Sequence, residues 1–186
     1  MRVIAGEAKG RRLRSVPGDV TRPITDRVKE ALFDILGEQV VDASVLDLFA
    51  GTGSVGIEAL SRGAQRTVFV EQDGRALRTI RENLHATHLR ERSEIIAGDV
   101  FDYLARLKGE EKFDIVYVAP PQYRGLWART LRVLDRKVPL TSQGVVVVQI
   151  FPKEYESLAL TNLVLTDQRR YGSTLLCFYA KATGPE

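Results

Sequence analysis

The chain has 186 residues, of which 44% are hydrophobic and 27% are charged, a balance typical of one globular domain with a single core. It contains no run of about 18 apolar residues, so we expect no membrane-spanning helix, and its first residues lack the apolar stretch of a secretion signal. Its single cysteine, Cys177, allows no internal disulfide. These features predict a cytoplasmic protein.

The net charge of +3 is unevenly distributed along the chain. Residues 1–29 contain eight Lys and Arg against three acids, whereas the remainder has two more acids than bases. A solvated loop would explain such a cluster, but we favour a polyanion as its partner, because Lys and Arg on a short ribbon neutralise phosphates and release counterions. The residues expected to contact RNA are Lys9, Arg11, Arg12 and Arg14.

Residues 1–40 are expected to form a small N-terminal extension. The segments Val3-Ile4-Ala5 and Arg12-Leu13-Arg14 flank the stretch from Gly6 to Gly10 and predict a β-hairpin. Residues 25–36 place Val28, Leu32 and Leu36 on one stripe, which is typical of an amphipathic helix. A turn at 17–19 separates the two pieces.

Residues 41–186 are expected to form the main domain, in which strand and helix patterns alternate. Strands are predicted at 45–49, 67–71, 94–96, 113–119, 145–150, 163–169 and 174–180, and helices at 55–62, 75–89, 100–107 and 126–136. Only four residues separate the last two strands, so these should be antiparallel neighbours at the sheet edge. The class is α/β, with a seven-stranded, mostly parallel sheet whose last strand is antiparallel.

A glycine-rich turn follows the first strand of this domain. Gly51, Gly53 and Gly56 have the GxGxxG spacing between a strand and a helix, which is typical of a turn that receives a nucleotide-like ligand. Asp47 ends the preceding strand, where a carboxylate would repel a pyrophosphate but attract the cationic S-adenosylmethionine. The turn therefore favours that cofactor over NAD, with a purely structural turn as the remaining alternative.

Two further acids follow the next strands, where ligands collect in an open α/β sheet. Glu71 lies twenty residues after Gly51, a spacing that suits a carboxylate accepting both ribose hydroxyls. Asp99 comes after the third strand and is expected to accept from the adenine amino group.

The fourth strand ends in a stiff proline turn that reads Ala119-Pro120-Pro121-Gln122-Tyr123, and we expect these five residues to form the catalytic site. The turn leaves carbonyl groups free and places an aromatic ring beside them, so it can hold a planar amine. It resembles the (Asp/Asn)-Pro-Pro-aromatic motif of methyltransferases that modify exocyclic amines of bases.

This turn departs from the motif at two positions. Ala119 stands in place of the acid or amide, and Gln122 is inserted before the aromatic Tyr123. Either the carbonyls of Ala119 and Pro120, helped by the Gln122 amide oxygen, orient the amine, or the site is catalytically weak. The loss of one acceptor is expected to cost roughly 1–3 kcal/mol, which slows an enzyme without abolishing it.

From Val3 to about Lys181 the chain resembles the RsmD family, which methylates the N2 amine of a guanine in bacterial 16S ribosomal RNA. The residues that carry this resemblance are VIAG with KGR near the N-terminus, RPITDR at 22–27, LDLFAGTGSVGIEALSRGA at 46–64 and VFVEQD at 68–73.

The resemblance implies a Rossmann-like class I methyltransferase that uses S-adenosyl-L-methionine, releases S-adenosyl-L-homocysteine, and acts on a guanine of the 966 type within the 30S subunit or its precursor. It also implies that the segment beginning at Arg22 lies over the methionine end of the cofactor. We expect a monomer. The expected cofactor contacts are Arg22, Thr25, Asp47, Gly51, Gly53, Glu71, Gln72, Asp99 and Val100.

Two other functions stay open on the sequence. One is a ribosome assembly or RNA-binding protein of methyltransferase fold that has lost turnover through Ala119. The other is a methyltransferase of the same motif class that acts on DNA adenine or on a protein glutamine amide. We predict no metal site, because His85 and His88 lack a third ligand of suitable spacing.

Overall fold

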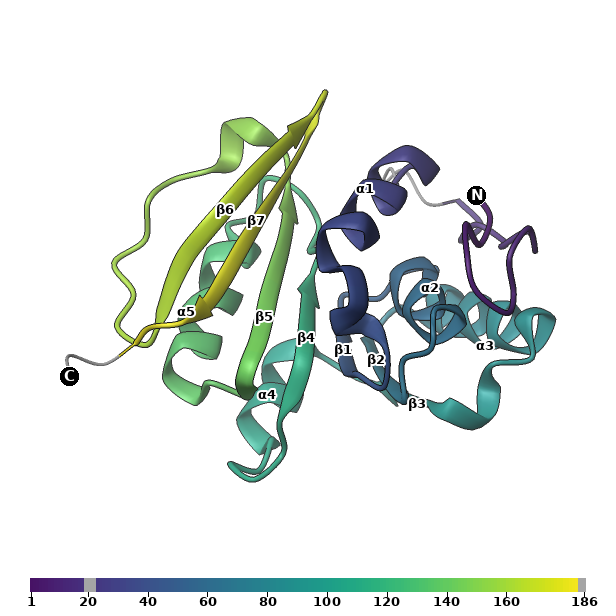
Figure 1. Cartoon of the computed structure of the whole chain (residues 1–186), viewed down its shortest axis with the longest axis horizontal. Helices are drawn as coiled ribbons and strands as arrows, with labels where there is room; N and C mark the ends of the chain where they lie inside the picture. Colours follow the sequence, from purple (N-terminus) through teal and green to yellow (C-terminus); the bar gives the residue numbers. More distant parts are fainter. Residues whose placement is uncertain (19–22, 184–186) are drawn as a thin grey trace.

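The computed structural model describes residues 1–18 and 23–183, and within them a sheet of seven strands runs in the order β3-β2-β1-β4-β5-β7-β6 (Figure 1). The strands are β1 (Ser44–Leu48), β2 (Arg66–Glu71), β3 (Ser93–Ala97), β4 (Phe113–Val118), β5 (Leu140–Ile150), β6 (Leu163–Tyr171) and β7 (Thr174–Lys181). Neighbours from β3 to β5 are parallel, whereas β7 is antiparallel to both β5 and β6. The expected sheet with an antiparallel last strand is confirmed.

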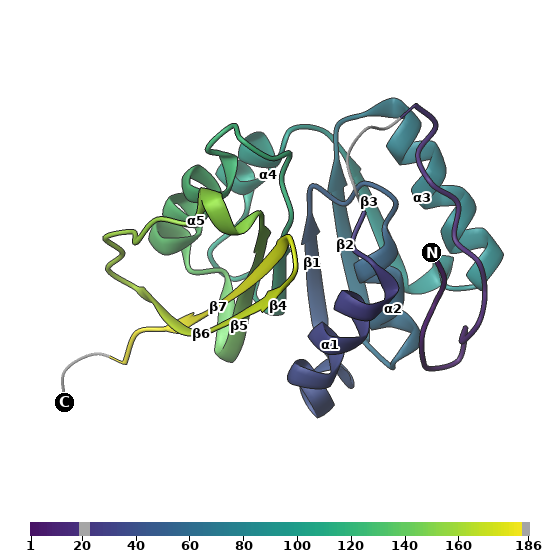
Figure 2. The same cartoon turned by 90° about the horizontal axis from the view of Figure 1, so that it is seen from above.

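Helices cover both faces of the sheet. They are α1 (Asp26–Leu36), α2 (Ser54–Ser61), α3 (Gly74–Thr87), α4 (Val100–Arg106) and α5 (Leu126–Lys137), with short 3-10 turns η1 (Gly37–Val40), η2 (Arg90–Arg92) and η3 (Pro152–Glu154). The first three pack on one face, and α4 and α5 pack on the other, as Figure 2 shows for α1 against α4 and α5. Among the described residues, no helix is both long and apolar enough to span a bilayer.

Strand β5 differs most from its expected bounds, because it begins at Leu140 instead of residue 145. Leu140 pairs with Phe113, and the register then shifts before Ile115 pairs with Val145. Gly144 permits this irregularity, since a Cβ there would lie 2.9 Å from the Phe113 carbonyl oxygen. The polar residues between Leu140 and Val145 concealed the early start from a search for apolar runs.

Alternation along β1 divides the core between the two faces. Val45 packs on the side of α1, α2 and α3, whereas Leu46 and Leu48 pack on the side of α4 and α5. Asp47 has the same parity as Val45, so its side chain belongs to the face that α2 covers.

The first 16 residues, here called the N-terminal strap, lie across α2 and α3. The two segments of the expected hairpin pair through an antiparallel bridge between Arg2 and Arg12 and through backbone hydrogen bonds, among them Val3 N–H to the Arg11 carbonyl oxygen at 2.9 Å. The strap also bonds to α2, where the Glu58 carboxylate accepts from the N–H groups of Ile4 and Ala5 at 2.9 and 3.0 Å. The turn expected at 17–19 includes Asp19, which lies outside the described residues.

Candidate functional site

The predicted site residues gather where the parallel strands end. Glu71 is the last residue of β2, Asp47 is the penultimate residue of β1, and Asp99 follows β3 by two positions. Because β3, β2, β1 and β4 are adjacent and parallel, these ends form one edge of the sheet, which also carries the proline turn after β4. This edge is the position at which open α/β sheets bind ligands.

The glycine turn is held tightly between β1 and α2. Gly51 and Gly53 adopt φ values of 57° and 74°, which side chains with a Cβ rarely take. Gly56 serves a different purpose, because a Cβ there would lie 2.4 Å from the Phe69 ring. The turn thus brings α2 directly against β2.

Asp47 lies beneath this turn. Its side chain is buried, and its Oδ2 accepts a hydrogen bond from the Gly56 N–H at 3.0 Å. Burial raises the pKa of Asp47 to about 8, against the opposing effect of the Gly56 hydrogen bond. A cation brought to this edge would favour the ionised form of Asp47, so the carboxyl group is suited to a positively charged ligand.

Glu71 connects the end of β2 to the glycine turn. Its Oε2 accepts from the Gly51 N–H at 2.8 Å, and its Oε1 accepts from the N–H groups of Gln72 and Asp73 at 2.8 and 2.9 Å. The carboxylate is therefore fixed by three backbone donors. Oε2 has a further lone pair with which it can accept from a ligand hydroxyl.

Asp99 begins α4 as its N-cap. Its Oδ1 accepts from the N–H groups of Phe101 and Asp102 at 2.8 and 3.1 Å, while Oδ2 has no hydrogen-bond partner in the part of the chain that the structure describes. That oxygen is available to an amino group. Val100, the next residue, is buried.

An aromatic cluster beside Asp99 was missed by the sequence reasoning. Phe49, which follows β1 with a positive φ of 59°, packs edge-on against Phe101 with ring centroids 6.5 Å apart. The Arg129 guanidinium lies 3.7 Å from the centroid of the Phe101 ring. The pairing of Phe49 with Phe101 joins residues from two elements about 50 positions apart, so no local pattern indicated it.

The proline turn presents Tyr123 to solvent. The Tyr123 side chain is 67% exposed, its φ is 59°, and its ring lies 5.8 Å from that of Phe151. Its N–H donates to Glu154 Oε1 at 2.7 Å, and Glu154 Oε2 accepts from the Phe151 N–H at 3.3 Å. Glu154, which the sequence reasoning also missed, therefore joins the turn after β4 to the segment after β5.

The other residues of the turn differ in exposure. Ala119 and Pro120 are partly buried, whereas Pro121 and Gln122 are exposed. Ala119 remains tied to β1 through a weak hydrogen bond of 3.5 Å from its N–H to the Leu48 carbonyl oxygen. This bond keeps the start of the turn beside the glycine turn.

A buried lysine supports the glycine turn from the side of α1. Lys29 Nζ donates to Ser54 Oγ at 3.0 Å and to the Arg2 carbonyl oxygen at 2.6 Å, and it lies 3.4 Å from Glu58 Oε2. Burial lowers the pKa of Lys29, and Glu58 opposes this shift. The cluster joins α1, the strap and the first turn of α2.

The remaining predicted residues are three expected cofactor contacts and four expected RNA contacts. Thr25 is the N-cap of α1 and accepts from the Val28 N–H at 3.3 Å, and Gln72 is exposed at the end of β2. Arg22 lies outside the described residues. Of the basic residues on the strap, Arg11 donates to the Ala86 carbonyl oxygen and Arg14 pairs with Glu82, whereas Lys9 and Arg12 extend from the surface without a protein partner among the described residues.

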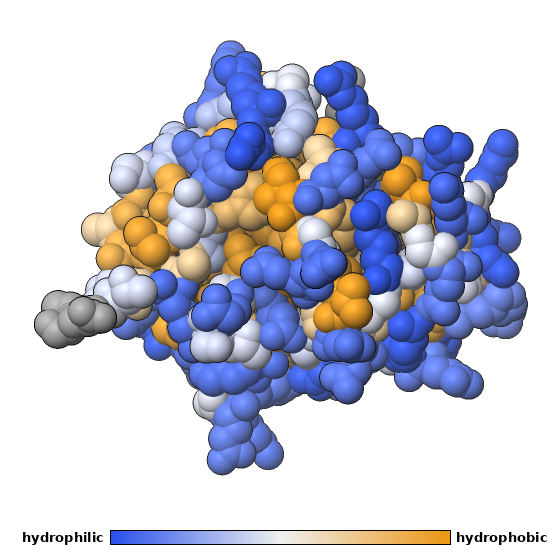
Figure 3. All heavy atoms as spheres, in the orientation of Figure 1, coloured by the Kyte–Doolittle hydropathy of each residue, from blue (hydrophilic) through white to orange (hydrophobic). Residues whose placement is uncertain are grey.

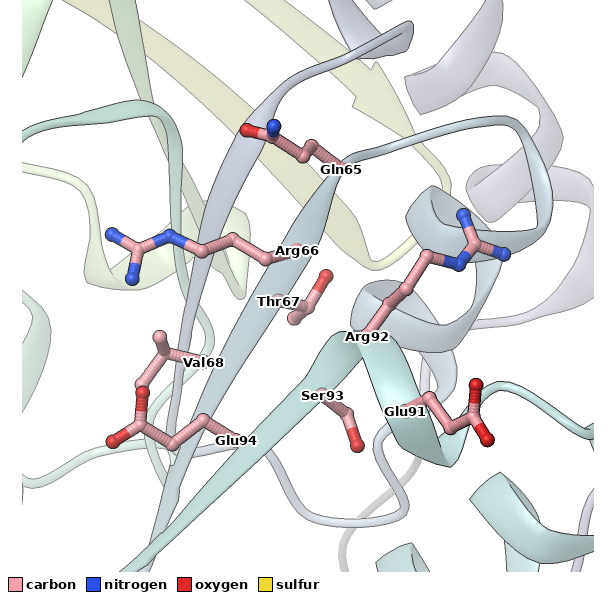
Figure 4. Close-up of a pocket in the computed structure, with 8 residues that line it drawn as sticks. All are labelled: Gln65, Arg66, Thr67, Val68, Glu91, Arg92, Ser93 and Glu94. Carbon is pink, nitrogen blue, oxygen red and sulfur yellow. The ribbon is translucent and has the colours of Figure 1, made fainter.

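A hollow of about 270 Å³ lies at the opposite ends of the strands, between residues 65–68 and 91–94 (Figure 4). Its two arginines are already bonded. Arg66 Nε donates to Ser44 Oγ at 2.7 Å, and Arg92 Nη1 donates to the Leu60 and Ala64 carbonyl oxygens. This hollow is separate from the edge of the sheet that carries Asp47, Glu71 and Asp99, which we call the acidic edge.

The strand order with an antiparallel β7, together with the glycine turn after β1, is that of the Rossmann-like methyltransferase fold. The chain belongs to the family described as "Conserved hypothetical protein 95", whose model matches residues 1–180.

Named relatives match along most of the chain. The chain is 36% identical over 182 residues to "Putative rRNA methyltransferase YlbH" of Bacillus subtilis, covering 97% of this chain and 99% of that protein. It is 36% identical over 149 residues to Ribosomal RNA small subunit methyltransferase D of Escherichia coli K12, covering 80% and 74%.

Solved structures share the fold. Hypothetical protein TTHA0928 of Thermus thermophilus superposes with a TM-score of 0.83 at 31% identity, covering 96% of this chain and 98% of that one. An RNA methyltransferase from Salinibacter ruber, in complex with S-adenosyl-L-homocysteine, has a TM-score of 0.66 at 15% identity, covering 89% and 97%.

Proposed function

We propose that this protein transfers a methyl group from S-adenosylmethionine to the exocyclic N2 amine of a guanine in 16S ribosomal RNA, as in the RsmD family that its sequence resembles. The observation that carries the proposal is the exposed ring of Tyr123, a residue whose backbone N–H donates to Glu154, at the same sheet edge as the three acids. A ring at this position offers a surface on which a flipped base can stack.

The cofactor, when bound, supplies an electrophilic methyl group on a sulfonium. In this proposal Glu71 accepts from the ribose hydroxyls and Asp99 Oδ2 accepts from the adenine amino group. Asp47 complements the positive charge of the methionine end, and the segment from Arg22 to Thr25 covers it. The glycine turn supplies close backbone contact.

The proline turn orients the amine. The carbonyls of Ala119 and Pro120 accept its hydrogens, so that its lone pair faces the methyl group. The nitrogen–carbon bond forms as the carbon–sulfur bond breaks, the electron pair of that bond goes to sulfur, and the amine then releases a proton to water. Because the thioether leaves as a neutral group, positioning is the main contribution of the protein.

Ribosomal RNA as the substrate has two supports. Relatives that match along most of the chain carry the names of rRNA methyltransferases. The strap also presents Lys9 and Arg12 to solvent, where they can contact phosphates. We propose that the protein acts in the cytoplasm as a monomer on the 30S subunit or its precursor.

Ala119 supports a second candidate, an RNA-binding assembly factor without turnover, because its methyl side chain replaces the acceptor of the motif. One assay separates the two. The protein is incubated with methyl-labelled S-adenosylmethionine and naked 16S RNA, precursor particles or mature 30S subunits, and the labelled nucleoside is then mapped.

We expect labelled N2-methylguanine at one position in the unaltered protein. No label on any of the three substrates, or label only with Ala119→Asp, would favour the assembly factor. A parallel reaction with DNA tests the other methyltransferase class, to which labelled adenine in that DNA, or a labelled glutamine amide in a protein of the 30S subunit, would assign the protein.

A further inference from the structure

Helix α3 carries a row of arginines on its outer face. Arg75, Arg78 and Arg81 are exposed and recur every three residues, so they share one side of the helix. The opposite side is buried, with Leu77, Ile80 and Leu84 among its core residues. We call the exposed side, formed by Arg75, Arg78 and Arg81, the α3 ridge.

The N-terminal strap lies along this helix. Asn83 fixes it, because its Oδ1 accepts from the Arg14 N–H at 2.7 Å and its Nδ2 donates to the Arg14 carbonyl oxygen at 3.1 Å. Arg11 reaches the Ala86 carbonyl oxygen at 2.6 Å, and Arg75 reaches that of Pro17 at 3.3 Å. The strap therefore runs alongside α3 (Figure 2), and Pro17, the residue directly after it, contacts the α3 ridge at Arg75.

Among the described residues, the positive charge of the α3 ridge is uncompensated at Arg78 and Arg81, whereas Arg75 pairs with Asp73 at 2.8 Å. Arg78 and Arg81 make no ion pair or hydrogen bond in the part of the chain that the structure describes, and Glu82, the acid beside them, pairs with Arg14. Figure 3 shows the hydropathy of the residues on one face of the molecule. Hydrophobic residues lie over the β5–β7 side of the sheet, and hydrophilic residues cover most of the strap side.

The position of α3 relates this surface to the site. The helix starts at Gly74, three residues after Glu71, so the α3 ridge begins beside the acidic edge, and its three arginines extend along about 9 Å of the helix away from it. An RNA strand that contacts the α3 ridge and the strap can therefore continue to the edge that carries Tyr123.

We propose that Arg78 and Arg81 of the α3 ridge bind phosphates of the substrate RNA and extend the contact surface of the strap. This inference rests on the proposed function, because it assumes an RNA substrate. Phosphates are the ligand we infer, since exposed arginines without acidic partners match a repeating anion and carry no base-reading geometry.

The test measures RNA affinity at several salt concentrations for the full-length protein. The variant carries Arg78→Ala and Arg81→Ala, and the matched control carries Arg106→Ala and Arg136→Ala, which remove the same charge from exposed positions on α4 and α5. A third variant, with Arg78→Lys and Arg81→Lys, retains the charge. Naked 16S RNA and 30S subunits serve as ligands, and S-adenosylhomocysteine affinity reports the integrity of the fold.

We expect the alanine variant of the α3 ridge to reduce the slope of log K against log salt by about 1.4–1.8, since each of the two phosphate contacts contributes about 0.7–0.9. The control should keep the slope of the unaltered protein, the lysine variant should retain most of it, and S-adenosylhomocysteine affinity should not change. An unchanged slope in the alanine variant, or an equal loss in the control, would overturn the inference.

Comparing the affinity for 30S subunits with that for naked RNA distinguishes an RNA partner from a protein partner. A loss of affinity for 30S subunits with none for naked RNA would assign the α3 ridge to a ribosomal protein and would also overturn the inference. Failure of the proposed function looks different, because the unaltered protein would then methylate no RNA, whatever the salt dependence of its binding.

Discussion

Lys29 Nζ lies 3.4 Å from Glu58 Oε2, and neither side chain has any exposed surface. The pair joins α1 to α2, and each partner also bonds to the strap, Lys29 through the Arg2 carbonyl oxygen and Glu58 through the N–H groups of Ile4 and Ala5. Glu58 additionally accepts from Arg62 at 2.9 Å. This buried cluster fixes the strap and the glycine turn to the same helix.

The two partners of this cluster should respond differently to substitution. Glu58→Gln leaves Lys29 as a buried charge and places an amide group among N–H donors, so we expect a loss of about 3–5 kcal/mol in the free energy of unfolding. Lys29→Met leaves Glu58 with Arg62 and two backbone donors, so its cost should be smaller, about 1–3 kcal/mol. Urea titration measures both, and an equal or reversed order would contradict this account.

The elevated pKa of Asp47 predicts a pH-dependent stability. The folded pKa is about 8, whereas an unfolded aspartate titrates near 4. Between these values the folded chain holds a proton that the unfolded chain has lost, so stability falls as pH rises through this window. Asp47→Asn can still accept from Gly56 and has no proton to lose. Its Tm relative to that of the wild type should therefore rise from pH 5 to pH 8, and parallel Tm curves would refute the assignment.

Glu71 should control cofactor affinity. S-adenosylhomocysteine is expected to bind in the micromolar range, at roughly −7 to −8 kcal/mol, and NADH should not compete with it. Glu71→Ala removes a ligand acceptor and the bond to Gly51, so affinity measured by calorimetry should fall about 10- to 100-fold. The control is Glu94→Ala, because Glu94 lies on the neighbouring strand β3 but at its start, away from the acidic edge. An unchanged affinity in Glu71→Ala, or tighter binding of NADH, would exclude this role.

Tyr123 should affect turnover and leave cofactor binding intact. Tyr123→Ala removes the stacking ring and should cost about 1–3 kcal/mol in kcat/KM, whereas Tyr123→Phe retains the ring and most of the activity. Glu154→Gln keeps one acceptor for the Tyr123 N–H and should have a smaller effect. All three variants should bind S-adenosylhomocysteine normally. If Tyr123→Phe were as impaired as Tyr123→Ala, stacking would not be the function of the ring.

The sequence predicted the main domain well because its signals are local. Apolar runs marked each strand, and the distances between them left room for a helix or only for a turn. Residues at the ends of these runs, such as Glu71 and Asp99, could therefore be assigned to one edge before the structure was known. Whether they hold the cofactor as proposed stays a prediction that the binding experiments address.

The sequence by itself determined the strand–helix alternation, the glycine turn and the acids that follow the strands, since each depends on residues close together in the chain. Only the tertiary structure decided which distant groups meet. It placed Glu154 on the Tyr123 turn, Lys29 against Glu58, and the strap along α3, the helix that carries Arg78 and Arg81. The physical reason is that the spacing of apolar residues along an element indicates which face of that element a side chain occupies, whereas packing between elements decides which side chains it contacts.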